Sequence, residues 1–525
     1  MSWLDGLPVL VLGLGDSGLA MVRWCVRHGA RVTAWDSRED APGDVVLRTD
    51  LPQVHRLSSL PLPAGEGWGE GGAPQLILKS PGLAPTDPRI AAFVQEARDT
   101  GIAVLGEVDL FARALADLKE TQAYAPKLLA ITGTNGKTTT TAMTALLVER
   151  AGKRVAMAGN IGPTLLDTLS TCLDREAAEW PDVWVLELSS FQLEGGGHGV
   201  QRGPLGFEPD AAVVLNITED HLDWHGNLAQ YTAAKARVFG SHALMVINRD
   251  DPAVEALVPV PVPAKGKVKL ADRPVPRATL RFGLDAPRRP GDFGLVVESG
   301  MAWLVRALPA DETFKKKKDE EEEIHLQRLM PADALRVRGR HNAANALAAL
   351  ALATAIGCPL APMLHGLREY EGEPHRVQFV AVVDGVEVFD DSKGTNVGAT
   401  VAALQGLGAD KAPGQLVVIL GGDGKGQDFA PLVAPLRQVA RAVATIGKDA
   451  AAIEAAIESG GRAVPVQRFV SLELAVAWGF AQARSGDALL LSPACASLDM
   501  FRNYVHRAEV FVAAVQAHAA DRGIA

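Results

Sequence analysis

Residues 127–140 read KLLAITGTNGKTTT, an apolar strand-like run that passes through a glycine-rich turn into an amphipathic helix at 139–151. Gly133 and Gly136 let backbone N–H groups approach phosphate oxygens, and the helix N-terminus adds positive potential. Lys137 can reach the terminal phosphates and the Thr138 hydroxyl can ligate Mg²⁺, so the stretch predicts a nucleotide-binding domain. Two residues separate the glycines, fewer than the four that precede Gly-Lys in the general phosphate loop, so this is a shorter variant. An ordinary glycine turn before a helix is the alternative.

Two other apolar runs lead into glycine-rich turns: 8–12 before GLGDSG at 13–18, and 416–420 before GGDGKG at 421–426. Each of the three runs is predicted to open a stretch of alternating strands and helices, the pattern of parallel sheets covered by helices. A length of 525 residues suggests about three domains. We therefore expect an α/β protein with an N-terminal Rossmann-like domain (1–116), a central P-loop ATPase-like domain built on a parallel sheet (117–372) and a C-terminal Rossmann-like domain (373–525).

Composition narrows the class of protein. The formal net charge of -10 argues against a non-specific nucleic-acid binder, which needs a basic face. The four cysteines have no close pair, so neither a disulfide framework nor a zinc site is expected, and a reducing, cytoplasmic location fits. Asp5 stands where a signal peptide would be cationic, so we expect no export signal. The longest apolar stretch, 343–358, is mostly alanine and favours a buried helix over a membrane span.

Two segments look inserted. Residues 60–74 are rich in proline and glycine without periodicity, and residues 315–323 read KKKKDEEEE. The basic run could be a binding patch, but the acidic residues that follow neutralise it, so a solvated surface loop is the favoured interpretation.

The first glycine turn matches a dinucleotide-binding fingerprint. Gly13, Gly15 and Gly18 follow a strand-like run, and acidic Asp36 ends the next one, at 31–35. The pattern alone cannot separate NAD from a UDP-sugar, and a purely structural turn is the alternative.

Several strand-like runs end in polar side chains. The run 183–186 delivers Glu187, where an α/β ATP site would keep a magnesium ligand, although a solvated glutamate is the alternative. The run 211–215 delivers the cluster 216–223, in which His221 is either a ligand or a structural residue. Asn342 and Asn345 face roughly the same way on one helix and either read a nucleobase or cap the helix.

The C-terminal part holds the remaining candidates. His375 and Arg376 precede the dense polar run 390–396, whose cations could clamp an anionic substrate or a transferring phosphate. Cys495 follows the strand-like run 489–491; it could be a nucleophile, but a buried thiol is favoured because no partner histidine can be assigned.

Together these stretches resemble the Mur ligases of peptidoglycan synthesis over nearly the whole chain. The resemblance rests on GTNGKTT at 133–139, AGNIG at 158–162, ELSSFQL at 187–193, GRHN at 339–342 and PHR at 374–376. The stretches DSKGTN at 391–396 and SPACASLD at 492–499 resemble the branch of the family that adds D-glutamate.

The resemblance implies three sets of binding residues. ATP is expected at Gly133, Thr134, Asn135, Gly136, Lys137, Thr138, Thr139, Asn342, Asn345, Arg376 and Asp391. The UDP-linked substrate is expected at Asp16, Ser17, Asp36, Ser37, Arg38, Gly82, Asn160, Ser189 and Gln192, so the fingerprint would hold no NAD. D-glutamate is expected at Lys393, Thr395, Lys425, Ser497, Leu498 and Tyr504.

The resemblance also implies the catalytic chemistry. Lys137, Glu187, His221 and Lys235 are the expected catalytic residues, and Thr138, Glu187, His221 and Lys235 the expected Mg²⁺ ligands. Lys235 matches the lysine that the family carries as an N-carbamate, an anion whose oxygens can ligate magnesium. The implied reaction activates the terminal carboxylate of UDP-N-acetylmuramoyl-L-alanine as an acyl phosphate, which the amine of D-glutamate then attacks. The third domain is expected to close over both sites.

Three segments depart from the family pattern, and three other functions remain as alternatives. Residues 60–74, 195–206 and 315–323 look like additions to the family pattern, without an assigned function. We expect a monomer without nucleic-acid partners. The rivals are a sibling ligase for another amino acid, a nicotinamide-dependent dehydrogenase and a non-catalytic nucleotide-sensing module.

Overall fold

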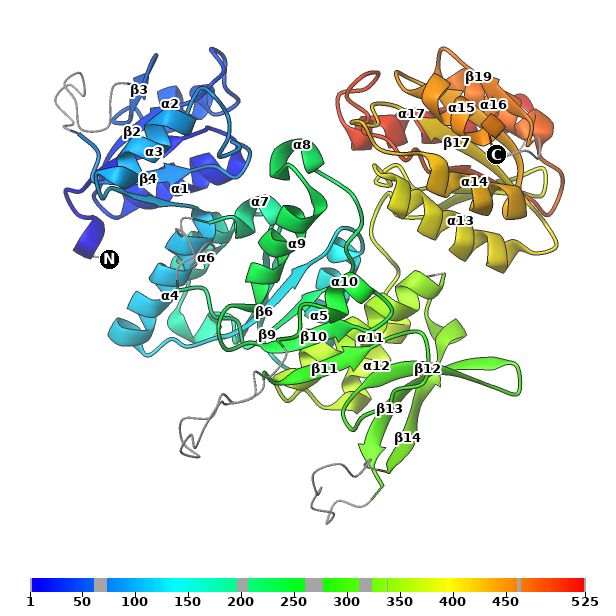
Figure 1. Cartoon of the computed structure of the whole chain (residues 1–525), viewed down its shortest axis with the longest axis horizontal. Helices are drawn as coiled ribbons and strands as arrows, with labels where there is room; N and C mark the ends of the chain where they lie inside the picture. Colours follow the sequence, from blue (N-terminus) through cyan, green and yellow to red (C-terminus); the bar gives the residue numbers. More distant parts are fainter. Residues whose placement is uncertain are drawn as a thin grey trace, which may run out of the picture.

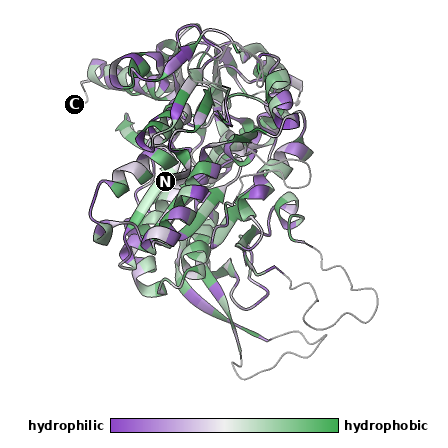
Figure 2. Ribbon diagram, turned by 90° about the vertical axis from the view of Figure 1, so that its left-hand side faces the viewer, coloured by the Kyte–Doolittle hydropathy of each residue, from purple (hydrophilic) through white to green (hydrophobic). Residues whose placement is uncertain are grey.

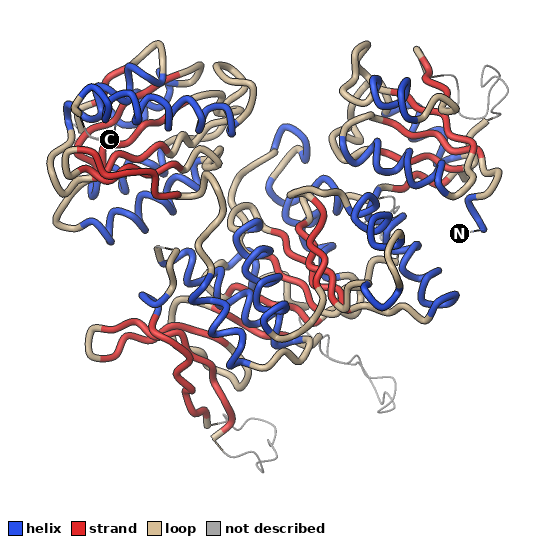
Figure 3. The backbone as a smooth tube through the Cα atoms, turned by 180° about the vertical axis from the view of Figure 1, so that it is seen from behind, coloured by secondary structure: helices blue, strands red, loops and turns tan. Residues whose placement is uncertain are grey.

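The computed structural model describes residues 2–60, 73–195, 206–259, 277–310, 323–337, 339–459 and 464–523. Three α/β bodies follow one another along the chain, the first and third flanking the second (Figure 1). The greater part of the expected insertions at 60–74, 195–206 and 315–323 lies outside the described residues. Seen from behind, each body contains a sheet with helices packed against it (Figure 3).

The first body has a five-stranded parallel sheet in the order β3-β2-β1-β4-β5. The strands expected at 8–12 and 31–35 form with those bounds. The glycine turn is tight, because a Cβ at Gly18 would lie 1.9 Å from the Gly13 carbonyl oxygen. The elements are β1 (Pro8–Leu12), α1 (Asp16–Arg27), β2 (Arg31–Trp35), α2 (Asp44–Asp50), β3 (His55–Leu57), β4 (Leu76–Lys79), α3 (Ala91–Asp99), β5 (Ala103–Leu105) and α4 (Glu107–Gln122).

The second body has a six-stranded parallel sheet in the order β11-β10-β9-β6-β8-β7. The phosphate-loop helix α5 starts at Lys137, two residues before its expected start, and packs against α11 and α12. The alanine-rich segment is the buried helix α11, as predicted. The elements are β6 (Lys127–Thr132), α5 (Lys137–Arg150), β7 (Val155–Gly159), α6 (Leu165–Leu173), β8 (Val183–Glu187), α7 (Ser190–Leu193), β9 (Ala211–Val214), α8 (Leu222–His225), α9 (Leu228–Ala236), β10 (Leu244–Asn248), α10 (Pro252–Glu255), β11 (Thr279–Phe282), α11 (Arg340–Ala355) and α12 (Leu360–Glu369).

A small antiparallel sheet extends from the second body, and the sequence patterns did not predict it. Its strands are β12 (Phe293–Glu298), β13 (Met301–Pro309) and β14 (Ile324–Pro331). Leu295 and Leu304 are paired across the first two strands and buried, so one face of this sheet joins the core of the second body.

The third body has a mixed six-stranded sheet in the order β15-β16-β20-β17-β18-β19. Its edge strand β15 runs antiparallel to β16, whereas the other neighbouring strands pair in parallel. The alternation of strands and helices expected after the third glycine-rich turn is present from β17 to β20. That turn follows β17, the third strand of the body along the chain. The elements are β15 (Gln378–Val383), β16 (Val386–Asp390), α13 (Val397–Lys411), β17 (Leu416–Gly421), α14 (Ala430–Val439), β18 (Ala440–Ile446), α15 (Ala450–Ser459), β19 (Val466–Arg468), α16 (Leu472–Gln482), β20 (Ala488–Leu491) and α17 (Tyr504–Asp521).

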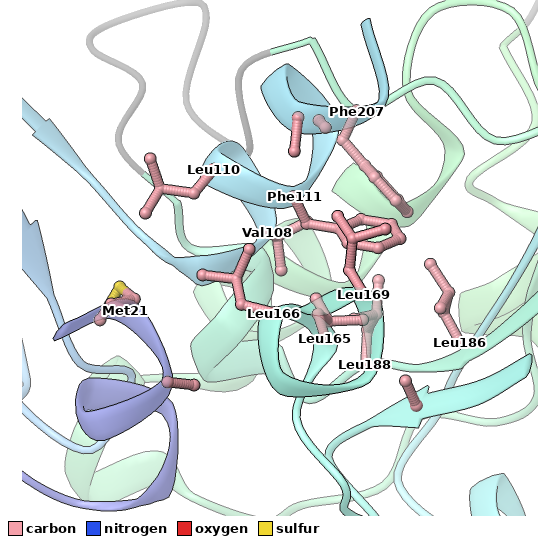
Figure 4. Packing of buried hydrophobic residues seen from close by; sticks show 14 of the residues in the cluster. Met21, Val108, Leu110, Phe111, Leu165, Leu166, Leu169, Leu186, Leu188 and Phe207 are labelled. Carbon is pink, nitrogen blue, oxygen red and sulfur yellow. The ribbon is translucent and has the colours of Figure 1, made fainter. Parts of the chain in front are cut away.

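The first and second bodies share one continuous apolar core. Helices α1, α4 and α6 pack together, and Met21, Phe111, Leu166 and Leu188 belong to the same buried cluster (Figure 4). Helix α4 is continuous through residues 116 and 117, where a domain boundary was expected. Apolar residues concentrate on the central strands, while the helices carry both apolar and polar positions (Figure 2). None of the described helices has the length and hydropathy that spanning a membrane requires.

Candidate active site at the phosphate loop

The phosphate loop is fixed by a reciprocal pair of hydrogen bonds to the end of β9. The Asn135 backbone N–H donates to Asn216 Oδ1 at 2.8 Å, and the Asn216 side-chain amide donates back to the Asn135 carbonyl at 3.0 Å. The Thr134 N–H donates to the Asn216 carbonyl at 2.9 Å. The loop is therefore held in a defined conformation at the carboxyl edge of the sheet, where parallel α/β sheets bind ligands.

Two lysines meet at this loop. Lys137 Nζ donates to the carbonyl oxygens of Gly133 and Thr134 at 2.9 and 2.8 Å, and Lys235 Nζ, carried by α9, donates to the same Gly133 oxygen at 2.8 Å. Burial lowers the pKa of both ammonium groups, and the charge of Lys137 lowers that of Lys235 further. Lys235 is 2% exposed and its pKa lies well below its usual value.

Glu187 lies at the carboxyl end of β8 and is buried. Its Oε1 accepts a hydrogen bond from the Asn160 side chain at 2.8 Å, whereas Oε2 is buried without a partner. A buried carboxylate oxygen with no donor nearby is a position that a cation or a protonated ligand would satisfy. The charge of Glu187 opposes part of the lowering of the pKa of both lysines, so Glu187 belongs to the same electrostatic cluster.

His221 stands beside this cluster, at the start of α8, with a left-handed backbone φ of 55°. Burial lowers its pKa, the charge of Asp220 at 3.6 Å opposes that effect, and the charges of Lys425, Lys137 and Lys235 lower the pKa further, which favours the neutral imidazole. Among the described residues, no three His, Cys, Asp or Glu side chains are arranged to hold a metal ion. The expected metal set includes only two residues of these types, Glu187 and His221, and needs the Thr138 hydroxyl and a modified Lys235 to complete it.

The third body reaches the phosphate loop through two contacts. The Arg376 guanidinium donates to Thr138 Oγ1 at 2.7 Å. The side-chain amides of Asn135 and Asn396 pair with each other at 3.1 and 3.3 Å. Residues that are more than 230 positions apart in the sequence are thus brought together at the nucleotide site.

A cavity between the second and third bodies opens onto the loop. Asn345, which donates to Asn342 Oδ1 at 3.1 Å, lies so close to Gly136 that a Cβ there would be 2.6 Å from its Oδ1. Asp391 also lines the cavity, and burial raises its pKa to about 7 although the Ser492 hydroxyl donates to it. The cavity wall includes expected ATP residues, Asn135, Gly136, Thr139, Asn342, Asn345, Arg376 and Asp391, together with Asn248, Phe282 and His341, which sequence reasoning missed. Phe282 ends the short strand β11 and carries no polar or charged group, so no local signal singled it out.

The expected uridine site lies at the carboxyl edge of the first sheet. The Leu14 N–H donates to Asp36 Oδ2 at 2.7 Å, and the Arg38 guanidinium donates to both carboxylate oxygens at 2.9 Å. Burial alone would raise the pKa of Asp36, but these hydrogen bonds lower it to about 2. Asp16 and Ser17 begin helix α1, and Ser37 and Gly82 lie on loops at the same edge; all four are exposed or half-buried.

Two expected substrate contacts bond to each other instead. The Ser189 N–H and hydroxyl both donate to Gln192 Oε1 at 3.0 Å, and the Gln192 N–H donates to Ser189 Oγ at 3.2 Å. This reciprocal arrangement is a capping box at the start of α7. The two side chains therefore have a structural role that the sequence reading did not consider.

The expected amino-acid site is assembled from three loops of the third body. Lys393 Nζ lies 3.7 Å from the centroid of the Tyr504 ring. Arg507, buried without a carboxylate hydrogen bond, ties two of the loops together by donating to the carbonyls of Ser392 and Cys495. A β-bridge from Asp423 to Ala496 joins the loops that carry Lys425 and Ser497.

The remaining residues of that set differ in exposure. Leu498 is 73% exposed and Lys425 is exposed, whereas Ser497 is buried and Thr395 half-buried. Burial raises the pKa of Cys495 to about 12, which confirms the prediction of a buried thiol.

Sequence comparisons cover the whole chain. Three family profiles match: "Mur ligase MurD-like, N-terminal domain" at residues 8–106, "Mur ligase middle domain" at 131–267 and "Mur ligase, glutamate ligase domain" at 375–495. The UDP-N-acetylmuramoylalanine--D-glutamate ligase of Albidiferax ferrireducens is 58% identical over 525 residues, covering 100% of this chain and 99% of that protein. The protein of the same name from Burkholderia multivorans is 53% identical, covering 98% of each chain.

Solved structures with low identity share the three-domain fold. The UDP-N-acetylmuramate-alanine ligase MurC of Thermotoga maritima has a TM-score of 0.53 at 20% identity, covering 98% of this chain and 100% of that one. The MurF ligase of the same organism, in complex with ADP, has a TM-score of 0.54 at 16% identity, covering 98% and 96%. At these identities the likeness extends to the fold alone.

Proposed function

The chain belongs to the Mur ligase family, and we propose that it joins D-glutamate to the alanyl carboxylate of UDP-N-acetylmuramoyl-L-alanine at the expense of ATP. The observation that carries the proposal is the identity of 50–58% along the full chain to ligases named for this reaction. The convergence of Lys137, Lys235 and Glu187 at the phosphate loop supports it. The enzyme would supply one step in the synthesis of peptidoglycan precursors.

In the proposed reaction the alanyl carboxylate attacks the γ-phosphate of ATP, and ADP leaves as an acyl phosphate forms. The D-glutamate amine then attacks the acyl carbon, and inorganic phosphate leaves as the amide bond forms. Lys137 would offset the charge that otherwise repels a carboxylate from a polyphosphate, and the loops would hold both partners in line. Arg376 would add a second cation from the third body, and closure of that body would exclude water from the acyl phosphate.

Magnesium fits the residues around Glu187. The unpartnered Oε2 of Glu187 and the Thr138 hydroxyl are oxygen ligands of the kind that Mg²⁺ prefers, and neutral His221 lies beside them. When bound, the ion would neutralise charge on the phosphate oxygens. We place it at Thr138, Glu187, His221 and Lys235.

Lys235 would complete this set as an N-carbamate. Only a neutral amine attacks CO₂, forming an N–C bond and releasing one proton. Burial and the neighbouring Lys137 favour the neutral amine of Lys235, which supports the modification. The product would place an anion at the loop where the neutral amine of Lys235 stood.

We further propose the binding sets for UDP-substrate and D-glutamate given by the motifs, domain boundaries near 116 and 372, a monomeric assembly and a cytoplasmic location. The reciprocal bonds of Ser189 and Gln192 make those two the weakest members of the substrate set. Light scattering on purified protein would test the monomer.

Phosphate release measured with ATP, Mg²⁺ and UDP-N-acetylmuramoyl-L-alanine, with and without D-glutamate, tests the function. We expect release only when D-glutamate is present, and the amide product by mass spectrometry. Equal release with another amino acid would favour a sibling ligase, and bound NAD would favour a dehydrogenase. ATP binding without any phosphate release would favour a sensing module.

A further inference from the structure

Glu107 is a buried carboxyl group that the proposed mechanism does not use. It is the first residue of α4, its exposed fraction is 2%, and its Oε1 accepts a hydrogen bond from the Leu166 N–H at 3.1 Å. Its Oε2 is buried without a hydrogen-bond partner. A half-satisfied carboxyl is costly in an apolar interior, so packing alone does not explain a glutamate at this position.

The group lies where three helices begin. Helix α4 starts at Glu107 itself, α6 of the second body starts at Leu165, and the Ser17 hydroxyl at the start of α1 in the first body interacts with the same carboxyl. Val108, which follows Glu107, and Leu166, whose amide donates to it, belong to the shared apolar core (Figure 4). Glu107 therefore connects the glycine loop of the first body to the second body.

No described cation forms an ion pair with Glu107. Helix α1 carries Asp16 and Arg23, and Arg23 is paired at 3.0 Å with Asp167 of α6. Lys79, which lines the same small cavity, donates instead to the carbonyls of Ser80 and Leu83, and the charges of Glu194 and Arg98 act on it. Burial raises the pKa of Glu107 to about 7 and the charge of Asp167 adds to the rise, while hydrogen bonds from the Leu166 and Leu165 amides and the Ser17 hydroxyl oppose it.

We propose that Glu107 is a positioning residue that acts through Ser17 to set how the glycine loop of the first body holds the anionic diphosphate of the UDP-linked substrate. This rests on the proposed function, which places the diphosphate at the N-terminus of α1, where backbone N–H groups favour anions. When Glu107 is neutral, its carboxyl group does not cancel any of the positive potential at the N-terminus of α1. An ionised Glu107 adds a negative charge beside the same hydroxyl, and like charges weaken binding.

The sign of the effect follows. Below about pH 7 the carboxyl is protonated and the substrate binds with full affinity; above it the carboxyl ionises and the KM for the UDP-linked substrate rises by up to about tenfold per pH unit. The diphosphate diester and the alanyl carboxylate do not titrate in this range. Asp391 in the ATP cavity also has a pKa of about 7, so the KM for ATP has a titrating group of its own in this range. Only the pH dependence that Glu107→Gln removes is therefore assigned to Glu107.

Steady-state kinetics between about pH 6 and pH 9 test the proposal with the full chain, comparing wild type, Glu107→Gln and Glu120→Gln. Glu107→Gln keeps the shape without the charge, so we expect its KM for the UDP-linked substrate to stay within about twofold over the range. Glu120 is exposed on the same helix, so Glu120→Gln should behave as wild type. A Glu107→Gln profile that matches wild type would overturn the proposal.

Calorimetry on wild type gives a second readout that does not depend on the variant. Binding of UDP-N-acetylmuramoyl-L-alanine at pH 7.5, measured in buffers of different ionisation enthalpy, should be accompanied by proton uptake, since the complex favours neutral Glu107. Absence of uptake would also overturn the proposal. If wild type neither binds this substrate nor releases phosphate, the proposed function fails; if it does both, a failure here concerns Glu107 alone.

Discussion

Lys137 and Lys235 donate to one and the same acceptor, the Gly133 carbonyl oxygen, at 2.9 and 2.8 Å. Two ammonium groups that share one oxygen repel each other, and the more deeply buried of them loses its proton first. The pKa of Lys235 is the more strongly lowered of the two, so the geometry favours Lys235 as the neutral amine and Lys137 as the cation that the proposed function assigns to the phosphates.

Lys235 should act, as its N-carbamate, as an anionic oxygen ligand rather than as a cation. Lys235→Met should lower kcat by more than about 100-fold, since even residues that only support metal ligands cost 10–100-fold. Lys235→Glu supplies a carboxylate directly and should recover part of the loss. ¹³C NMR of protein equilibrated with ¹³C-bicarbonate should show a carbamate signal in wild type and none in Lys235→Met. Full activity in Lys235→Met would contradict the role.

Replacing Lys137, which begins α5, should lower the activity far more than replacing Lys127, which begins the strand before the phosphate loop. Lys137→Met should lower kcat by about 10²–10³-fold, the usual effect of removing one group that stabilises developing charge. Lys127 begins β6 and its side chain is 56% exposed in an ion pair with Asp210, so Lys127→Met should stay within about twofold of wild type. The measurement is the rate of phosphate release at saturating ATP for both variants. Equal losses in the two variants would mean that the substitutions disturb the fold rather than remove a catalytic cation.

Arg376 should couple the third body to the nucleotide. Its guanidinium donates to Thr138 Oγ1 across the boundary between the bodies, and a charge-assisted bond of about 1.5–3 kcal/mol corresponds to about 10–100-fold. Arg376→Ala should therefore raise the KM for ATP or lower kcat by that factor. Arg368→Ala, on the exposed side of α12, serves as the control. Unchanged ATP kinetics in Arg376→Ala would contradict the coupling.

Asp36 should contribute to stability at neutral pH. Its folded pKa of about 2 lies below the unfolded value of 3.8, so its contribution is present above about pH 4 and lost as the pH falls toward 2. In wild type, acid unfolding followed by circular dichroism should include this loss. Asp36→Asn should start less stable at pH 7, by about 1–2 kcal/mol, and converge with wild type near pH 2. A constant difference across the range would mean that ionisation of Asp36 is not the cause.

Much of the architecture follows from local sequence. The strands at 8–12, 31–35 and 127–132 form as predicted. The first and third are apolar runs closed by a glycine-rich turn, as at Gly18, and the second ends at the polar residues Asp36 and Ser37. The antiparallel strands β12 to β14 were missed although Ser299 and Gly300, both with positive φ, form a two-residue hairpin turn between β12 and β13. These strands are stabilised by packing against the second body, which a local pattern does not reveal. The position of β15 was missed because pairing direction is a tertiary property.

Some features of the candidate site could likewise be predicted from the local sequence, and others depend on the fold. Lys137 and Glu187 are placed by the ends of their own strands, so the sequence could point to them. The pairing of Asn135 with Asn216, and the burial that sets the charge state of Glu107, depend on segments that meet only in the fold. Ser189 and Gln192 look like free polar groups in the sequence, and only the structure reveals that they satisfy each other.

The apolar cluster that runs through α1, α4 and α6 has a mechanical meaning. Because the sheets of the first and second bodies share this cluster, the two bodies should unfold as one cooperative unit and move together as one rigid part. Under the proposed function, closure over the amino acid would then fall to the C-terminal body alone, with a hinge beyond Glu369, where α12 ends.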